Sequence, residues 1–405
     1  MSNCSSQYRS GLDRVIEKEV QIPFTGPTGL ITNHTGRDHQ MRQNLDLFLN
    51  DLKLNLQLDI QKIFAPEHGF RGSAAAGEKV DDSKDPASGL PVISLYGDNK
   101  KPSSEVLEGL ETLVFDIQDV GVRYYTYIST LFYCLEAAKE NDLNFVILDR
   151  YNPLGRKVEG NLLKDEFKSF VGATSLPLRH GMTVGELAIW AVETGKIDGP
   201  KPGEGLEVIE LKNWQGEACQ EISEPWLAPS PNIPSTEANT LYPVTAIFEG
   251  TNLSEGRGTT LPFQVVGAPW LNNMVLTLKM RSYEFPGVSY RPLSFTPKSS
   301  KHQGENCKGI QLFITEPEKV DSLKLGLTLM AEIKKLHPEE FEFFKLDDNR
   351  YFIDLLLGTD SYREVLNKLI DNPEFNYQKA LADLIKGYEA EIEGFKKERE
   401  KYLIY

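Results

Sequence analysis

The chain has 405 residues, of which 40% are hydrophobic, so it is long enough for a large buried core and for two or three domains. It contains no run of about 18 apolar residues, which excludes a membrane-spanning helix. Its net charge of −15 argues against a nucleic acid partner, which needs a basic surface, and its four widely separated cysteines exclude a zinc knuckle or a disulfide framework.

The first half of the chain alternates between predicted strands and predicted helices. Continuous apolar strands that alternate with helices are typical of a parallel sheet covered by helices on both faces, so we predict an α/β fold. Between two of the strands, residues 72–89 are polar and suit a mobile loop or lid. The expected strands lie at 28–33, 62–65, 91–96, 110–117 and 144–149, and the expected helices at 11–20, 37–50, 124–139 and 183–193.

The second half of the chain has a different pattern. Residues 198–243 are rich in proline, and after about residue 265 short apolar runs precede longer helical patterns. We therefore expect a larger domain over residues 1–265 and a smaller C-terminal α/β domain over residues 266–405. The strands expected in the smaller domain lie near 274–279 and 309–314, and its helices at 319–336, 362–371 and 377–387.

Polar side chains follow several of the predicted strands. Ligands of open α/β sheets bind beyond the carboxyl ends of the strands, so such residues are candidates for a site. The stretch 63–72 is the strongest signal, because two glycines allow a sharp turn directly after a strand. The candidates at strand ends are Glu67, His68, Arg71, Asp116, Asp119, Asp149, Arg150 and Asn152.

Sequence motifs for nucleotides and metals are absent. There is no phosphate-binding G-x-x-x-x-G-K-[ST], no complete dinucleotide fingerprint and no nucleophile elbow G-x-S-x-G. The six histidines are scattered and form no H-E-x-x-H. We therefore predict neither a cofactor nor a metal ion.

What remains is a set of carboxylates with arginines and tyrosines among them. Glycoside cleavage needs one carboxylic acid to protonate the leaving oxygen and a second group to stabilise or attack the sugar carbon, and arginine pairs with a substrate carboxylate. The pattern fits an acidic sugar as well as other polar ligands. Structural alternatives stay open: Glu67 with Arg71 and Asp149 with Arg150 as ion pairs, Glu255 with Arg257 bracing a turn, and Tyr127 as a core residue.

Five motifs, in order, resemble the bacterial exo-β-N-acetylmuramidase family, formerly a domain of unknown function. They lie at residues 65–72, 115–127, 149–155, 229–234 and 249–259, and the similarity extends from about residue 25 to the end of the chain. The resemblance implies release of N-acetylmuramic acid from the non-reducing end of peptidoglycan fragments, at its β-1,4 link to N-acetylglucosamine. It also implies a Rossmann-like domain that binds no nucleotide, with the active site in a cleft between two subdomains.

The resemblance places the catalytic glutamate at Glu67, and the other roles are assigned by chemistry. Arg71, Arg123 or Arg257 would receive the lactyl carboxylate of the sugar. Asp116, Asp119 or Tyr127 would be the second catalytic group. The further substrate-binding candidates are His68, Asp149, Arg150, Asn152, Asn232, Glu249 and Glu255.

Two alternatives to this enzyme remain. The first is a non-catalytic protein that binds muropeptides or cell-wall sugars on the same scaffold, and the second is an amidase or esterase, which the missing nucleophile motif disfavours. The first twenty residues lack the apolar segment of a signal peptide, so we expect a cytoplasmic enzyme that acts on recycled muropeptides. If a signal was removed ahead of residue 1, the expectation becomes export to the periplasm or cell wall.

Overall fold

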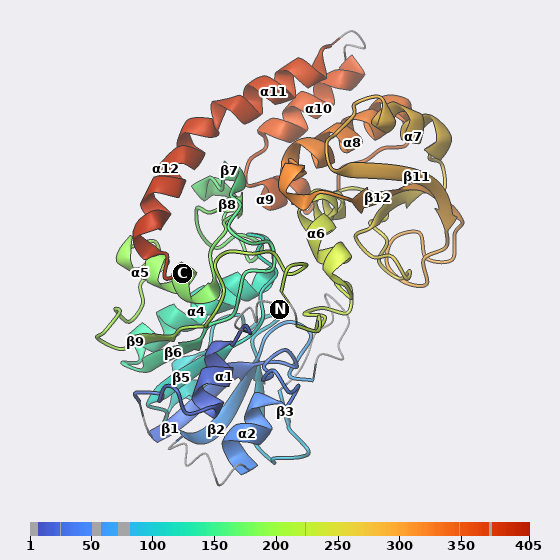
Figure 1. Cartoon of the computed structure of the whole chain (residues 1–405). Helices are drawn as coiled ribbons and strands as arrows, with labels where there is room; N and C mark the ends of the chain where they lie inside the picture. The colour runs from blue at the N-terminus through green and yellow to red at the C-terminus, as the bar shows by residue number, and fades with distance from the viewer. Residues whose placement is uncertain are drawn as a thin grey trace, which may run out of the picture.

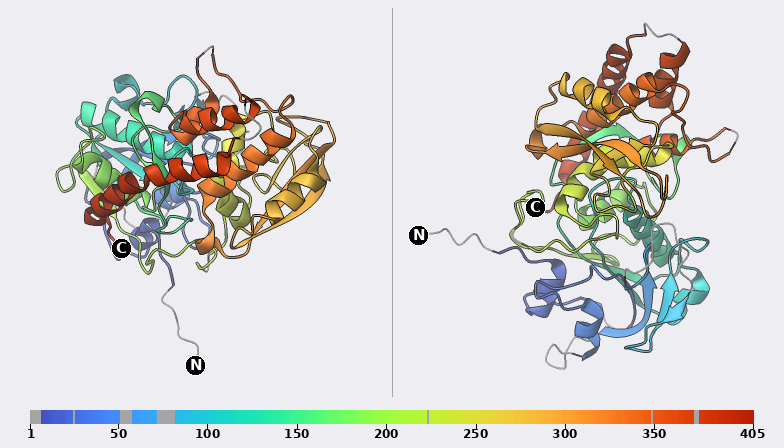
Figure 2. Two further views of the ribbon diagram at one scale, coloured as in Figure 1. Left: turned by 90° about the horizontal axis from the view of Figure 1, so that it is seen from above. Right: turned by 90° about the vertical axis from the view of Figure 1, so that its right-hand side faces the viewer.

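The computed structural model describes residues 7–24, 26–50, 58–71, 82–222, 224–347, 349–371 and 375–405. These residues form two lobes, an N-terminal lobe around a large sheet and a C-terminal lobe around a smaller sheet (Figures 1 and 2). Most of the loop predicted as a lid, residues 72–81, lies outside the described residues. Among the helices of the described chain, none combines the length and the apolar character needed to cross a membrane.

The sheet of the N-terminal lobe has seven strands in the order β3-β4-β2-β1-β5-β6-β9. All neighbours pair in parallel except β3, which runs antiparallel to β4. The chain leaves the central β1 toward β2 on one side and later reaches β5 on the other, which creates a topological switch point between β1 and β5. The strands are β1 (Gly26–Thr32), β2 (Leu58–Ala65), β3 (Ser83–Lys84), β4 (Pro91–Ser94), β5 (Thr112–Asp116), β6 (Asn144–Leu148) and β9 (Leu206–Ile209).

Successive side chains of a strand point to opposite faces of the sheet, and in a parallel sheet both faces are apolar and must be covered. Helices cover both faces here. Phe115 of β5 belongs to the core that includes α4 and α5, whereas its neighbour Val114 belongs to the core that includes α1 and α2. This arrangement confirms the predicted α/β class with its parallel sheet. The covering helices are α1 (Gly11–Ile16), α2 (Asn44–Asn50), α3 (Ser104–Leu107), α4 (Thr126–Glu140) and α5 (Val184–Glu193).

The C-terminal lobe contains the antiparallel sheet β10-β12-β11, against which α6 and α7 pack, and α8 packs against these two helices. This lobe is the smaller α/β unit that the sequence predicts. Its elements are α6 (Thr236–Thr245), η2 (Ala246–Gly250), β10 (Val265–Ala268), α7 (Asn273–Arg281), β11 (Val288–Phe295), β12 (Cys307–Ile314), η3 (Pro317–Lys319), α8 (Ser322–Leu336), α9 (Phe352–Leu357), α10 (Ser361–Asp371) and α11 (Tyr377–Gly387).

One predicted element of this lobe is wrong. Residues 274–279 were expected as a strand, but they form α7, and the Asn272 side chain accepts a hydrogen bond from Val275 N (3.3 Å) at its start. The buried apolar residues of α7 are Leu276 and Met280. They are four residues apart, which is a helical spacing. The N-cap and this spacing outweigh the β-branched appearance of the run.

The predicted domain boundary at 265/266 coincides with the start of β10, whereas α6 already packs against α8 and β12. We therefore propose that the division lies before α6. The end of the chain returns to the N-terminal lobe, where α12 (Glu389–Arg399) lies along β7 (Glu159–Leu162) and the short η4 (Glu400–Tyr402) contacts α5 (Figure 1). The two remaining elements are β8 (Pro177–Arg179), which pairs with β7, and η1 (Asp165–Phe167).

Candidate functional site

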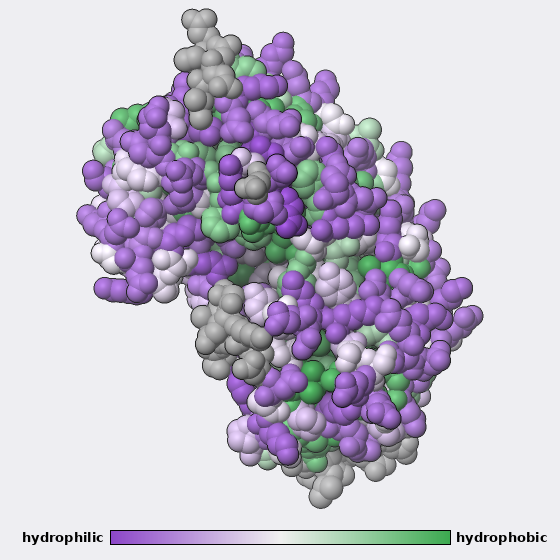
Figure 3. All heavy atoms as spheres, turned by 180° about the vertical axis from the view of Figure 1, so that it is seen from behind, coloured by the Kyte–Doolittle hydropathy of each residue, from purple (hydrophilic) through white to green (hydrophobic). Residues whose placement is uncertain are grey.

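A cavity of about 830 Å³ lies between the carboxyl ends of the N-terminal strands and the C-terminal lobe. From behind, the surface of the molecule is visibly hollowed between the two lobes (Figure 3). Five of the residues predicted for the site line the cavity, and they come from both lobes. They are Glu67, His68, Asn232, Glu249 and Arg257.

Glu67 reaches the cavity because β2 ends abruptly two residues before it. His68 and Gly69 both have positive φ angles, 74° and 73°, so the backbone reverses directly after Glu67. Such a conformation is uncommon for a residue other than glycine and tends to be kept at functional positions. His68 is itself buried, with 3% exposure, and its ring lines the cavity beside Glu67.

The Glu67 carboxylate is half-buried and held by its neighbours. Thr126, the first residue of α4, donates a hydrogen bond from Oγ1 to Glu67 Oε2 (2.9 Å). Burial, the charge of Glu67 and a hydrogen bond to Glu67 raise the pKa of Tyr96 to about 12, so this phenol stays protonated beside the carboxylate. A carboxyl group fixed in this way at a cavity wall is suited to transfer a proton to a bound substrate.

Glu249 and Arg257, which line the cavity, belong to a charged cluster of the C-terminal lobe. We call this cluster the charged wall, and it consists of Glu249, Glu255, Arg257 and Lys301. Arg257 donates from Nη2 to Glu249 Oε1 (2.8 Å), and its Nε lies 3.2 Å from Glu255 Oε1. Lys301 Nζ lies 2.9 Å from Glu255 Oε2 and also donates to the carbonyl oxygens of residues 248 and 253. Burial raises the pKa of Glu249, while Arg257 opposes the rise and Glu255 adds to it.

Aromatic side chains complete the lining of the cavity. Tyr242 packs edge-on against Phe263, with ring centroids 4.6 Å apart, and against Tyr125, at 6.0 Å. On the side of the N-terminal lobe, the rings of Tyr96 and Phe170 lie together, with ring centroids 6.1 Å apart. Of these residues, sequence reasoning singled out only Tyr125, although Tyr96 ends a predicted strand in the same way as the acidic candidates do.

Asp116 and Arg150 do not line the cavity. They form a buried ion pair, with Arg150 Nε 2.7 Å from Asp116 Oδ1, and Asn44 donates to Asp116 Oδ2 (2.7 Å). Arg150 thus pairs with Asp116 and not with Asp149, which was the alternative considered from the sequence. The Asp149 carboxylate accepts a hydrogen bond from Thr183 Oγ1 (2.7 Å). These contacts connect β5, β6 and the helices beside them, which favours a structural role.

Three further candidates also lie outside the cavity lining. Asp149 accepts additional hydrogen bonds from Gly185 N (2.9 Å) and Tyr405 Oη (2.9 Å), and so joins β6 to the start of α5 and to the end of the chain. Asn152 donates to the carbonyl of residue 182 (3.0 Å) and shapes a turn. The Arg71 side chain is 45% exposed and forms an ion pair with Asp85 (2.6 Å). Arg71 therefore pairs with Asp85, and not with Glu67 as the structural alternative had it.

Tyr127 is buried next to Glu67. Its hydroxyl donates to the carbonyl of residue 229 (2.8 Å) and accepts from Asn33 Nδ2 (2.9 Å). The same hydroxyl lies 3.4 Å from the backbone oxygen of Glu67. Tyr127 therefore supports the turn that carries Glu67, and its predicted role as second catalytic group stays a prediction.

Arg123 is buried and donates to three backbone carbonyls, those of residues 161 (2.9 Å), 176 (2.6 Å) and 356 (3.0 Å). Since residue 356 belongs to α9, this guanidinium links the two lobes.

We expect Arg123→Lys to lower the free energy of unfolding by about 2–4 kcal/mol, because a lysine cannot replace all three charge-assisted hydrogen bonds. Urea unfolding measures this change, with the exposed Arg350→Lys as control. An unchanged stability together with a raised KM would instead support the predicted sugar-binding role.

Asp119 is buried near the same turn, and only one of its oxygens is satisfied within the described residues. Gly121 N donates to Oδ2 (2.6 Å), whereas Oδ1 has no hydrogen-bond partner there. Burial raises the pKa of Asp119 to about 7. The folded state therefore keeps a proton that the unfolded state releases near pH 4, so the contribution of Asp119 to stability is most favourable below about pH 4 and falls as the pH rises to about 7.

We accordingly expect Asp119→Asn to remove this part of the pH dependence. The neutral amide has no proton to lose, so the variant gains stability over the wild type between about pH 4 and 7, by at most about 4 kcal/mol. Thermal and urea unfolding at a series of pH values measure the difference. Parallel pH profiles for the two proteins would show that Asp119 is ionised in the folded state throughout.

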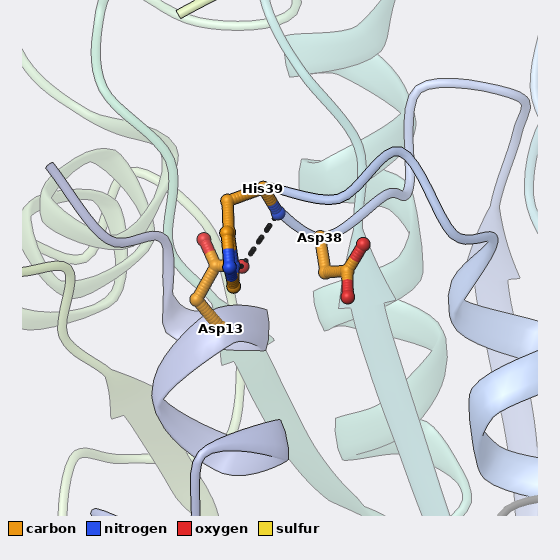
Figure 4. Close-up of side chains that lie close together, drawn as sticks. All are labelled: Asp13, Asp38 and His39. Carbon is orange, nitrogen blue, oxygen red and sulfur yellow. Dashed lines mark hydrogen bonds and ion pairs between the residues drawn. The ribbon is translucent and has the colours of Figure 1, made fainter.

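The described residues also contain one cluster with the spacing of metal ligands, formed by Asp13, Asp38 and His39 (Figure 4). Asp13 Oδ1 accepts from both N (2.7 Å) and Nδ1 (2.9 Å) of His39. Asp38 Oδ2 accepts from Arg42 Nε (2.8 Å). Because these ligand atoms already hold hydrogen bonds or ion pairs, the cluster ties α1 to the loop after β1 and fits a metal ion poorly.

Comparisons with known proteins agree with this two-lobed architecture. The family model described as "Exo-beta-N-acetylmuramidase NamZ, N-terminal" matches residues 28–237, and the corresponding C-terminal model matches residues 240–405. The chain is 41% identical over 401 residues to the peptidoglycan beta-N-acetylmuramidase NamZ of Bacillus subtilis, covering 98% of this chain and 92% of that protein.

Two solved structures of DUF1343 family proteins from Bacteroides fragilis are also similar. One is 30% identical to this chain with a TM-score of 0.86, and the match covers 98% of this chain and 99% of the solved chain. The other is 31% identical with a TM-score of 0.75 and covers 99% of both chains. The predicted family and the predicted enzyme class, a glycoside hydrolase, are confirmed by these matches. The chain belongs to the exo-β-N-acetylmuramidase NamZ family.

Proposed function

We propose that this protein releases N-acetylmuramic acid from the non-reducing end of peptidoglycan fragments by cutting its β-1,4 link to N-acetylglucosamine. The observation that carries the proposal is the cavity between the lobes, which is lined both by a fixed carboxylate of the N-terminal lobe and by an arginine of the C-terminal lobe. Membership of the NamZ family supports both the reaction and the peptidoglycan-derived substrate.

Glu67 is the proposed general acid. It lines the cavity, and its carboxylate is positioned by the Thr126 hydroxyl at 2.9 Å. In the reaction it gives a proton to the oxygen that leaves with N-acetylglucosamine, so that the bond to the muramic acid carbon breaks. None of the three residues predicted as second catalytic group lines the cavity, and Glu249 is the other glutamate that does.

Arg257 is the proposed receptor of the lactyl carboxylate. Of the three arginines predicted for this role, Arg257 is the one in the cavity lining, whereas Arg123 and Arg71 have partners elsewhere. Its guanidinium is 19% exposed, and its Nη1 donates no hydrogen bond within the described part of the chain. A planar fork with a free N–H edge is suited to bind a carboxylate through two hydrogen bonds.

Hydrolysis of a chromogenic β-N-acetylmuraminide beside the matching β-N-acetylglucosaminide tests the proposal. We expect turnover of the muraminide and a much lower kcat/KM for the glucosaminide, because only the first sugar has the carboxylate that Arg257 recognises. Turnover of neither sugar would contradict the proposal. The cytoplasmic compartment stays a prediction.

A further inference from the structure

The charged wall is electrically balanced before a substrate binds. Glu249 and Glu255 supply two negative charges, and Arg257 and Lys301 supply two positive charges within hydrogen-bond or ion-pair distance. The lactyl carboxylate of the proposed substrate would add a third negative charge. Since the wall is largely withdrawn from water, an uncompensated anion there is costly, and protonation of one carboxylate removes the cost.

The two carboxylates of the wall differ in how firmly they are held as anions. Glu255 is 1% exposed and contacts two cations, Arg257 through Oε1 (3.2 Å) and Lys301 through Oε2 (2.9 Å). Glu249 is 21% exposed, lines the cavity and contacts a single cation, through one hydrogen bond from Arg257 Nη2 (2.8 Å). Glu249 is therefore the carboxylate that a competing anion can separate from its partner.

The position of that hydrogen bond makes the competition direct. A carboxylate that pairs with the Nη1–Nη2 edge of Arg257 finds Nη1 free, but at Nη2 it meets the Glu249 oxygen that this nitrogen already binds. Two carboxylates that share Nη2 repel each other, so bidentate binding of a substrate carboxylate favours release of Glu249 from the guanidinium. Burial already favours the neutral form of Glu249, since it raises the pKa of this carboxyl.

We propose that Glu249 is a specificity-determining residue of the cavity, which exchanges its place on Arg257 for the carboxylate of an acidic sugar and takes up one proton as it does so. The proton comes from the solvent, and the neutral carboxyl group that forms can donate a hydrogen bond where the anion could only accept. This proposal rests on the proposed function, because it takes Arg257 as the receptor of the lactyl group.

Other ionisable groups lie around Glu249, and a test must distinguish proton uptake by Glu249 from proton uptake by these groups. Tyr96, Tyr124 and Tyr242 lie close enough to sense its charge, and burial keeps the pKa of each above its ordinary value, so they remain protonated near neutral pH. Across the cavity, Glu67 and His68 are the other acidic and basic side chains of the lining. A variant at Glu249 therefore distinguishes its proton from theirs.

The experiment is calorimetric titration of the full chain with N-acetylmuramic acid, from pH 5 to 8, in buffers with different ionisation enthalpies. N-acetylglucosamine, which lacks the lactyl group, is the control ligand. We expect the wild type to take up close to one proton per N-acetylmuramic acid bound above the pKa of Glu249, so that affinity falls up to tenfold per pH unit. N-acetylglucosamine should bind without proton uptake.

Glu249→Gln is the decisive variant, and the exposed Glu305→Gln in the same lobe is its matched control. We expect Glu249→Gln to bind N-acetylmuramic acid without proton uptake and with a flat pH profile, whereas Glu305→Gln behaves like the wild type. Proton uptake that persists in Glu249→Gln would assign the proton to another group and overturn the proposal. If the variant does not fold, absence of proton uptake in the wild type alone overturns it.

Activity separates the failure of this proposal from the failure of the proposed function. Muraminide turnover without proton-linked binding would contradict the exchange at Glu249 and leave the glycosidase intact. No binding of N-acetylmuramic acid at any pH would overturn the exchange together with the role of Arg257. A fall in kcat of more than about a hundredfold in Glu249→Gln, with KM unchanged, would identify Glu249 as the second catalytic carboxylate and contradict its role in specificity.

Discussion

Glu67→Gln is expected to lower kcat for a β-N-acetylmuraminide at least about a hundredfold without unfolding the protein. Positioned acid catalysis contributes about 10²–10⁴ to a rate, and the amide has no proton of suitable acidity to give. The fold should survive, because the amide oxygen can still accept the hydrogen bond from Thr126 that now reaches Glu67 Oε2 (2.9 Å). The backbone turn at residues 67–69 does not depend on the charge of the side chain.

Steady-state hydrolysis and thermal unfolding of the same preparation measure this effect. Glu166→Gln is a matched control, because Glu166 is an exposed glutamate of the same lobe in η1, away from the cavity. The control should retain wild-type kcat and KM. A folded Glu67→Gln variant that keeps more than about a tenth of the wild-type kcat would exclude Glu67 as the general acid.

Arg257→Lys is expected to raise KM for the muraminide at least about tenfold and to reduce the preference for it over the glucosaminide. Lysine keeps the positive charge between Glu249 and Glu255 but offers no planar fork for a second carboxylate, so the substrate loses a charge-assisted hydrogen bond. Such a bond contributes about 1.5–3 kcal/mol, which corresponds to roughly a 10- to 100-fold change in affinity.

The comparison of both sugars makes this prediction specific to recognition. The glucosaminide has no lactyl group, so its kcat/KM should change much less than that of the muraminide. Arg71→Lys is the matched control, since Arg71 is exposed and pairs with Asp85 outside the cavity lining. Equal losses for the two sugars would show that Arg257 acts through the packing of the charged wall, and a loss in Arg71→Lys alone would move the carboxylate site to Arg71.

The sheet could be predicted from the sequence because its signal is local. Buried parallel strands contain short, continuously apolar runs, and such runs occur in β5, in β6 and at the end of β2, residues 63–65. The order of the strands could not be predicted, since pairing depends on contacts between segments far apart in the chain. The helix α7 was mistaken for a strand because its apolar run is short, and periodicity separates the two poorly at that length.

The site could be predicted only in part, because residues with the same local pattern have different surroundings. Glu67 and Asp116 both end an apolar strand, yet Glu67 faces the cavity and Asp116 is paired with Arg150. Glu67 lies in the turn two residues beyond β2, whereas Asp116 is the last residue of β5, and tertiary packing decides which groups surround each of them. Tyr96 was missed for the opposite reason, since an aromatic residue at the end of a strand is usually taken as part of the core.

The most direct test of the proposed function is product analysis with two disaccharides that differ only in the order of their sugars. The protein should release N-acetylmuramic acid from N-acetylmuramyl-β-1,4-N-acetylglucosamine and leave N-acetylglucosaminyl-β-1,4-N-acetylmuramic acid intact, because we propose that the cavity binds muramic acid at the non-reducing end. Cleavage of the second disaccharide, or binding of the first without any cleavage, would contradict the assignment.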